Sequence, residues 1–177
     1  MAQDTIKCYD TPSDVVAALA EDFIAFTNEE ISRTETCIVG ITGGTVINGL
    51  LETLNSPEYI ERVNWERIFF VWTDERFLPQ SHEDNYFNRV KPYLLCKAKG
   101  AAHFFPINTN SKTVIEAADE YEKEIGNVLK ACKKSGLDLA ILDLGEDGHT
   151  AGLFAGSHAL RVADRNVVAV EDGKVWE

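Results

Sequence analysis

The sequence predicts an α/β fold, in which a mostly parallel, Rossmann-like sheet carries helices on both faces. Two observations support this class. Short apolar runs alternate along the chain with stretches whose apolar residues recur at steps of three and four, the spacing of a helix. The short runs are apolar at every position, as in parallel strands that are buried on both sides. Strands and helices in alternation typically build a parallel sheet between two layers of helices.

The first third of the chain predicts two strands and two helices. A short strand is expected at Thr5–Tyr9. A helix follows, because Thr11 precedes a proline and an early acid, and apolar residues at helical steps run from Val15 to Phe26. The β-branched run Thr36–Ile41 predicts a buried strand, and helical spacing resumes after Thr45.

The rest of the chain continues the alternation. The predicted elements are, in order, a buried strand at Ile68–Trp72, a polar loop at Thr73–Asp84, a helix from about Asn85 that Pro92 bends or ends, a short strand at His103–Ile107, a long helix capped by Ser111, and buried strands at Asp138–Leu144 and Val167–Val170. No repeat, linker or low-complexity tract interrupts the sequence, so we expect residues 1–177 to form a single domain.

Composition excludes several classes of protein. Hydrophobic residues make up 45% and charged residues 26%, which is typical of a globular chain. No apolar run approaches the roughly 18 residues of a membrane span, and the first residues lack the layout of a signal peptide. We therefore expect a cytoplasmic protein that does not bind a membrane. The fold alone does not fix the oligomeric state, and we favour a monomer.

The charge balance is strongly acidic. Seventeen basic residues face twenty-nine acidic ones, a net charge of -12, which disfavours nucleic acid as a partner. A small anionic substrate then requires a locally basic site. The four cysteines contain no C-x-x-C pair and are expected to be reduced packing residues; they are Cys8, Cys37, Cys96 and Cys132. No histidine stands at metal-ligand spacing, so we expect no metal.

Ligands of parallel sheets bind beyond the carboxyl ends of the strands, where three loops of this chain are found. The first loop is Thr42, Gly43, Gly44 and Thr45. Its glycines allow a ligand close to the backbone, and a helix N-terminus favours an anion. The alternative is an ordinary strand-to-helix turn with a threonine cap.

The second loop places Asp74 and Arg76 directly after a buried strand. Arg76 is a candidate to hold developing negative charge, with Asp74 orienting it. A network of surface ion pairs is an equally good interpretation. Farther along, Asn85 is polar enough for contacts but obeys no firm spacing rule.

The third loop carries His149 between a glycine and a threonine, past the end of a buried strand. A histidine there is a candidate general base, and Asp147 or another carboxylate could fix its tautomer. A serine hydrolase is disfavoured because the chain has no G-x-S-x-G elbow. His103, between an alanine and a phenylalanine, is interpreted as a packing residue.

Three segments carry a family resemblance: ITGGTVINGLLETL, FFVWTDERFLPQSHEDNYFNRVKPYLL and LDLAILDLGEDGHTAGLFAGS. They resemble, in order, the 6-phosphogluconolactonase family, within the glucosamine-6-phosphate isomerase/6-phosphogluconolactonase superfamily. The resemblance implies hydrolysis of 6-phospho-D-glucono-1,5-lactone to 6-phospho-D-gluconate, without a metal or cofactor. It implies that His149 is the general base and that Arg76, with Asp74 beside it, stabilises the oxyanion or grips the phosphate. The residues implied to bind or support the substrate are Thr42, Gly43, Gly44, Thr45, Asn85 and Asp147.

Some features depart from the family pattern. Thr45 is followed by Val46 and Ile47 rather than by further hydroxyls, and Ala155 stands where a proline is common. The chain ends at Val175–Glu177, so we expect a fold that is short at the C-terminus. Two alternatives stay open: an isomerase–deaminase of amino-sugar phosphates on the same fold, and a non-catalytic binder of sugar phosphates.

Overall fold

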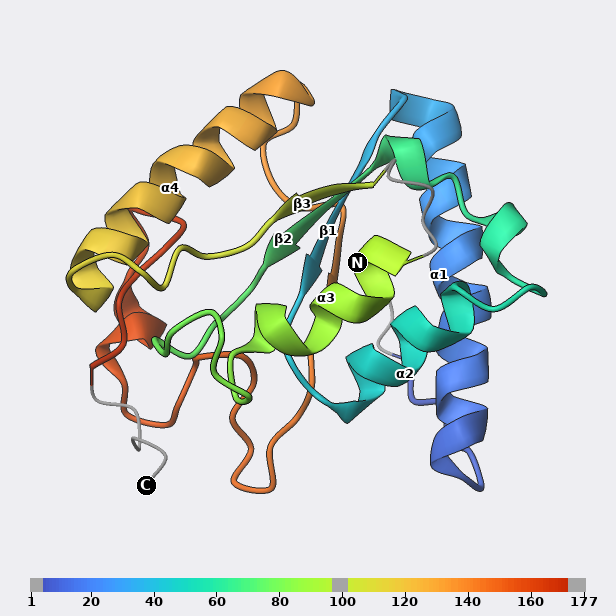
Figure 1. Cartoon of the computed structure of the whole chain (residues 1–177), viewed down its shortest axis with the longest axis horizontal. Coiled ribbons are helices and arrows are strands. Elements are labelled where there is room, and N and C mark those ends of the chain that lie inside the picture. The colour runs from blue at the N-terminus through green and yellow to red at the C-terminus, as the bar shows by residue number, and fades with distance from the viewer. Residues whose placement is uncertain (1–4, 97–101, 172–177) are drawn as a thin grey trace.

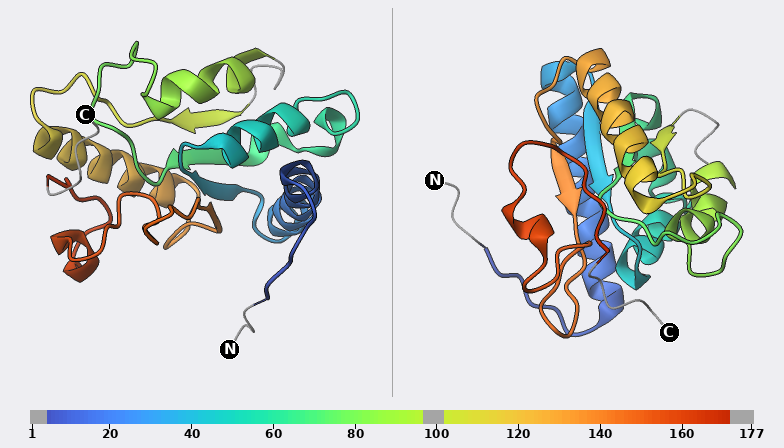
Figure 2. Two further views of the ribbon diagram at one scale, coloured as in Figure 1. Left: turned by 90° about the horizontal axis from the view of Figure 1, so that it is seen from below. Right: turned by 90° about the vertical axis from the view of Figure 1, so that its left-hand side faces the viewer.

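A computed structural model describes residues 5–96 and 102–171 of the chain. Its strands are β1 (Cys37–Ile41), β2 (Ile68–Trp72), β3 (His103–Phe105) and β4 (Leu139–Ile141), and its α-helices are α1 (Pro12–Thr34), α2 (Thr45–Leu54), α3 (Tyr86–Cys96) and α4 (Val114–Ala131). The strands pair in the order β3-β2-β1-β4, and each pair is parallel. Helix α4 lies on one side of the sheet, and α1 and α2 lie on the other (Figure 1; Figure 2). The predicted α/β fold is confirmed.

The core lies on both sides of the two central strands. Every residue of β1 is buried. On one side, the ring of Phe23 in α1 stacks on Phe70 of β2, with 6.3 Å between the ring centroids. The Tyr121 hydroxyl of α4 accepts a hydrogen bond from the backbone N–H of Trp72 at 2.6 Å and donates to the carbonyl of Phe105 at 2.9 Å. The two helix layers are therefore fixed to the same strands.

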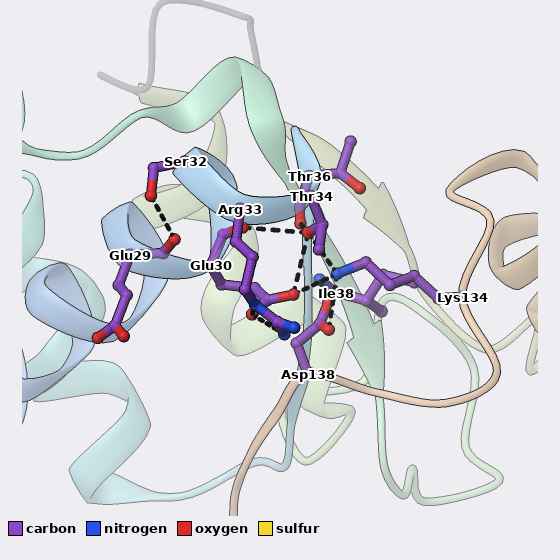
Figure 3. A network of polar contacts seen from close by, with 9 residues as sticks. All are labelled: Glu29, Glu30, Ser32, Arg33, Thr34, Thr36, Ile38, Lys134 and Asp138. Atoms are coloured by element: carbon purple, nitrogen blue, oxygen red, sulfur yellow. Dashed lines mark hydrogen bonds and ion pairs between the residues drawn. The ribbon is translucent and has the colours of Figure 1, made fainter.

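A polar network joins α1 to the start of β4 at the end of the sheet where the strands begin (Figure 3). The Lys134 ammonium contacts the carboxylates of Glu30 at 2.6 Å and Asp138 at 2.7 Å. Arg33 holds the second oxygen of Glu30 at 2.6 Å, and the backbone N–H of Ile38 donates to Asp138 at 2.8 Å. The buried Glu30 and the partly buried Asp138 are thus paired with basic side chains, which offsets the cost of removing their charges from water.

Several predicted elements are confirmed. The strand predicted at Ile68–Trp72 is β2, and the strand predicted at Thr36–Ile41 is β1 without its first residue. Thr11 is the N-cap of α1, and its hydroxyl accepts a hydrogen bond from the N–H of Asp14 at 3.2 Å. Helix α3 continues through Pro92 to Cys96, so the proline does not end it.

Two strand predictions are wrong. Residues 5–9 form no strand; they are exposed, and no strand pairs with them. Residues 167–170 form none either, because the segment lies against α4, where the Val167 N–H donates to the carboxylate of Glu122 at 2.6 Å.

Three predicted boundaries are also wrong. Strand β3 ends at Phe105 rather than at Ile107. Strand β4 ends at Ile141, and the following Leu142 and Leu144 are 45% and 78% exposed. The cap of α4 is Thr113; the Ser111 hydroxyl instead donates to the carboxylate of Glu120 at 2.7 Å. The predicted ending at residues 175–177 lies outside the described residues. Within residues 5–96 and 102–171, no helix is both long and apolar enough to cross a membrane.

Candidate active site

The three predicted loops meet beyond the carboxyl ends of the strands, at the lower end of the sheet in Figure 1. The Thr42 hydroxyl, after β1, donates a hydrogen bond to the carboxylate of Asp74, after β2. A Cβ placed on Gly152, after β4, would lie 3.9 Å from the Cβ of Asp74. Asp74 therefore joins the first two loops and lies close to the backbone that follows the third.

The glycine loop is closely packed. A Cβ on Gly43 would overlap the ring of Tyr86 in α3. Gly44 has a φ of 144°, and a Cβ there would overlap Oδ2 of Asp143 and lie 3.0 Å from its Cγ. Helix α2 begins at Thr45 and has no acidic residue in its first turn. The loop thus ends at a helix N-terminus that favours an anion.

Asp74 and Arg76 both lie in the second loop. Burial raises the pKa of Asp74, while the hydroxyls of Thr42 and Thr73 and the charge of Arg76 act in the opposite direction. The Arg76 guanidinium contacts the carboxylate of Asp84 at 3.2 Å and lies over the ring of Tyr86, with 5.1 Å to its centroid. Its side chain is only 17% exposed. Asp84 also lies 3.9 Å from Arg89, so Arg76 is a largely buried cation within a small ion-pair network, and its action on a substrate stays a prediction.

Glu75 has a role that the sequence analysis missed. Its carboxylate accepts hydrogen bonds from the backbone N–H groups of Arg76 and Tyr86 at 2.8 Å and of Phe87 at 2.9 Å. Burial nevertheless raises the pKa of Glu75 to about 7. The side chain fixes the second loop to the first turn of α3. Glu75 precedes the predicted helix start at about Asn85 by ten residues, too far for the sequence to indicate this contact.

Asn85 is fully buried at the start of α3. Its side-chain oxygen accepts the N–H of Asn88 at 3.0 Å, and its nitrogen donates to the carbonyl of Leu78 at 3.3 Å. Asn85 therefore supports the second loop, while its prediction as a substrate-binding residue stays a prediction.

His149 lies on a glycine turn. The N–H of Gly148, which has a φ of 84°, donates to the carbonyl of Gly145 at 2.9 Å. A Cβ on Gly145 would overlap the His149 ring, and the ring stacks on Phe154 with 4.6 Å between centroids. The imidazole thus packs against both a glycine and an aromatic ring.

The Nδ1 atom of His149 contacts the carboxylate of Asp147. The same carboxylate accepts the backbone N–H of His149 at 3.2 Å, and the hydrogen bond from the ring lowers the pKa of Asp147. A carboxylate on Nδ1 favours the tautomer that carries its proton there, so Nε2 is the nitrogen that can accept a proton. This is the arrangement of an oriented general base.

Other features lie apart from this site. His103 stacks on Phe69, with 4.4 Å between centroids, but it is exposed in β3 rather than buried as a packing residue would be. A cavity of about 260 Å³ is lined by Asn108, Glu120, Tyr121 and Glu124 and contains none of the predicted site residues. Among the described residues, no three His, Cys, Asp or Glu side chains are grouped as metal ligands.

Residues 10–175 match the protein family described as "Glucosamine-6-phosphate isomerases/6-phosphogluconolactonase". The chain belongs to this family. A member from Arabidopsis thaliana, "6-phosphogluconolactonase 3, chloroplastic", is 28% identical over 176 residues, which cover 94% of this chain and 54% of that protein. The "Probable 6-phosphogluconolactonase 3, chloroplastic" of Oryza sativa subsp. japonica is 32% identical over 157 residues, which cover 84% of this chain and 47% of that protein. The chain spans about half the length of these relatives.

Solved structures show the same fold. The 6-phosphogluconolactonase of Trypanosoma brucei has a TM-score of 0.79 at 24% identity, over 94% of this chain and 69% of its own. The 6-phosphogluconolactonase of Thermotoga maritima has a TM-score of 0.69 at 26% identity, over 78% of this chain and 60% of its own. These likenesses establish the sheet and its helices, while the roles of individual residues rest on the geometry above.

Proposed function

We propose that this chain hydrolyses 6-phospho-D-glucono-1,5-lactone to 6-phospho-D-gluconate, acting as a single domain without a metal or cofactor. The pairing of His149 with Asp147, in the loop that follows β4, is the observation that carries the proposal. Relatives named 6-phosphogluconolactonase, at 28% and 32% identity, support the choice of substrate. The expectations of a cytoplasmic monomer and of no nucleic-acid partner stay predictions.

The chemistry needs one base and one centre of positive charge. Nε2 of His149 takes a proton from water as the water oxygen attacks the lactone carbonyl carbon. The carbonyl oxygen becomes an oxyanion, and the Arg76 guanidinium stabilises it. When the carbonyl re-forms, the bond to the ring oxygen breaks, and the imidazolium returns its proton to that oxygen as a hydroxyl. Asp147 stabilises the imidazolium between the two proton transfers.

The substrate phosphate is assigned to the glycine loop. The missing side chains of Gly43 and Gly44 admit the Tyr86 ring and the Asp143 carboxylate. The donors offered to an anion are therefore the N-terminus of α2 and the Thr45 hydroxyl. Asp74 positions the loop through Thr42. These groups and Arg76 provide the local attraction that a chain of net charge -12 needs to hold an anion.

The family description also names glucosamine-6-phosphate isomerases. That activity would release ammonia from an amino-sugar phosphate, so an ammonia assay separates it from lactone hydrolysis. A binder without turnover would retain 6-phosphogluconate but leave the lactone to its spontaneous decay.

The test is hydrolysis of freshly prepared lactone by the wild type, by His149→Ala and by His103→Ala. We expect the wild type to exceed the spontaneous rate and His149→Ala to lose about 10²–10⁴-fold. We expect His103→Ala, which removes a histidine outside the site, to hydrolyse the lactone at the wild-type rate. Wild-type turnover in a folded His149→Ala protein would disprove the role of the base, and no acceleration by the folded wild type would disprove the proposed activity.

A further inference from the structure

Asp143 is an acid inside the candidate site that the proposed mechanism does not use. It follows β4, and its carboxylate packs directly on Gly44, so closely that a Cβ there would overlap Oδ2. The Thr150 hydroxyl donates to the Asp143 carbonyl at 2.8 Å, and Leu144 forms an antiparallel bridge with Thr150. The backbone beside His149 therefore fixes the position of the acid against the glycine loop.

The carboxylate lies where the proposed function puts a phosphate. Gly44 is the residue immediately before α2, whose first turn carries no acid of its own. Asp143 is half-buried, and burial raises its pKa, since its charge is less well solvated than in water. Two anions that share one helix N-terminus repel each other, and they do so more strongly where water is partly excluded.

We propose that Asp143 is a specificity-determining residue of this site, whose carboxylate opposes a phosphate at the glycine loop and so weakens the affinity for phosphorylated ligands. The inference rests on the proposed function, because that function assigns the phosphate to this loop. The predicted effect is on the affinity for a phosphorylated sugar acid relative to the affinity for the same sugar acid without its phosphate. Repulsion from one fixed charge at a few ångströms corresponds to about a tenfold change in affinity.

The test compares the binding of 6-phosphogluconate and of gluconate by calorimetry near neutral pH. Asp143→Asn keeps the size of the side chain and removes its charge, and Asp143→Ser provides a second neutral variant. Glu146→Gln is the matched control, because it removes one exposed carboxylate from the same loop. We expect both Asp143 variants to bind 6-phosphogluconate about tenfold more tightly than the wild type. Gluconate binding, and all binding by Glu146→Gln, stays at the wild-type level.

Three results would overturn the inference: unchanged or weaker binding of 6-phosphogluconate by the Asp143 variants, an equal gain for gluconate, or an equal gain in Glu146→Gln. Lactone turnover by the same proteins separates this inference from the proposed function. Turnover with unchanged affinity in the variants rejects the role of Asp143 alone. Absence of both turnover and 6-phosphogluconate binding in the folded proteins rejects the proposed function, and the role of Asp143 with it.

Discussion

Asp147 acts on the imidazole of His149 in two ways. It contacts Nδ1 of the ring and accepts the backbone N–H of His149 at 3.2 Å, so it fixes both the tautomer and the turn. Asp147→Asn removes the negative charge that stabilises the imidazolium but keeps a group of the same size. We expect kcat to fall about tenfold or more while KM stays near its wild-type value, because Asp147 acts on the imidazole and its protonated form and not on the bound substrate.

Steady-state kinetics on the lactone, together with thermal unfolding, test this role. A purely structural role for Asp147 would lower the melting temperature and leave the folded fraction fully active. Glu146→Gln controls for the loss of a carboxylate from the same loop. Wild-type kcat in Asp147→Asn would show that the contact with Nδ1 has no part in the reaction.

The sequence predicted some of these residues and missed others for a physical reason. His149 and Asp147 lie two positions apart in a glycine turn, so the turn itself brings them together. The packing of Asp143 on Gly44 joins residues that are far apart in the chain, and only the pairing of β1 with β4 creates it. Local spacing carries no signal for contacts of that kind.

Helix α3 depends on an acid outside it. Glu75 accepts three backbone N–H groups, two of them from the first residues of α3. Such N–H groups have no partner within their own helix, and leaving them unpaired costs about 1–3 kcal/mol. We therefore expect Glu75→Ala to lower the free energy of unfolding by about 1–3 kcal/mol, measured by urea denaturation.

Glu83→Ala is the matched control, because it removes an exposed acid from the same loop. We expect it to change the free energy of unfolding by no more than about 0.5 kcal/mol. Equal stability of Glu75→Ala and Glu83→Ala would show that Glu75 does not hold α3.

The predicted elements were most accurate where burial is complete. Strands β1 and β2 are central, so their apolar runs coincide with their paired lengths. Strand β4 lies at the edge of the described sheet, and its apolar run continues past its last pairing into exposed leucines. An apolar run indicates that its residues prefer to be buried, but a strand ends where its pairing with the neighbouring strand ends.

The polar network of Glu30, Arg33, Lys134 and Asp138 makes the stability of the fold depend on pH. Lys134 and Arg33, as hydrogen-bond donors, lower the pKa of Glu30 to about 2, although burial acts in the opposite direction. The side chains of Glu30 and Lys134 are 7% and 10% exposed, so water screens their contact little, whereas the Arg33 side chain is 71% exposed. At the other end of the sheet, burial raises the pKa of Glu75 to about 7. The two acids therefore change the stability of the fold in different pH ranges and in opposite directions.

The direction in which each acid changes the stability of the fold depends on whether the folded or the unfolded state binds its proton more tightly. Glu30 has a lower pKa when folded than the ordinary 4.5, so its contribution is complete above pH 4.5 and is lost as the pH falls toward about 2. Glu75 has a higher pKa in the folded protein, so its charge reduces the stability of the fold as the pH rises from 4.5 to about 7.

For Glu30→Gln we expect the free energy of unfolding to fall by about 2–3 kcal/mol near neutral pH. The difference from the wild type shrinks to almost nothing as the pH approaches about 2. Urea denaturation across that range, with the exposed Glu29→Gln as control, measures it. A loss that stays constant with pH would mean that the packing of Glu30, rather than its charge, joins α1 to β4.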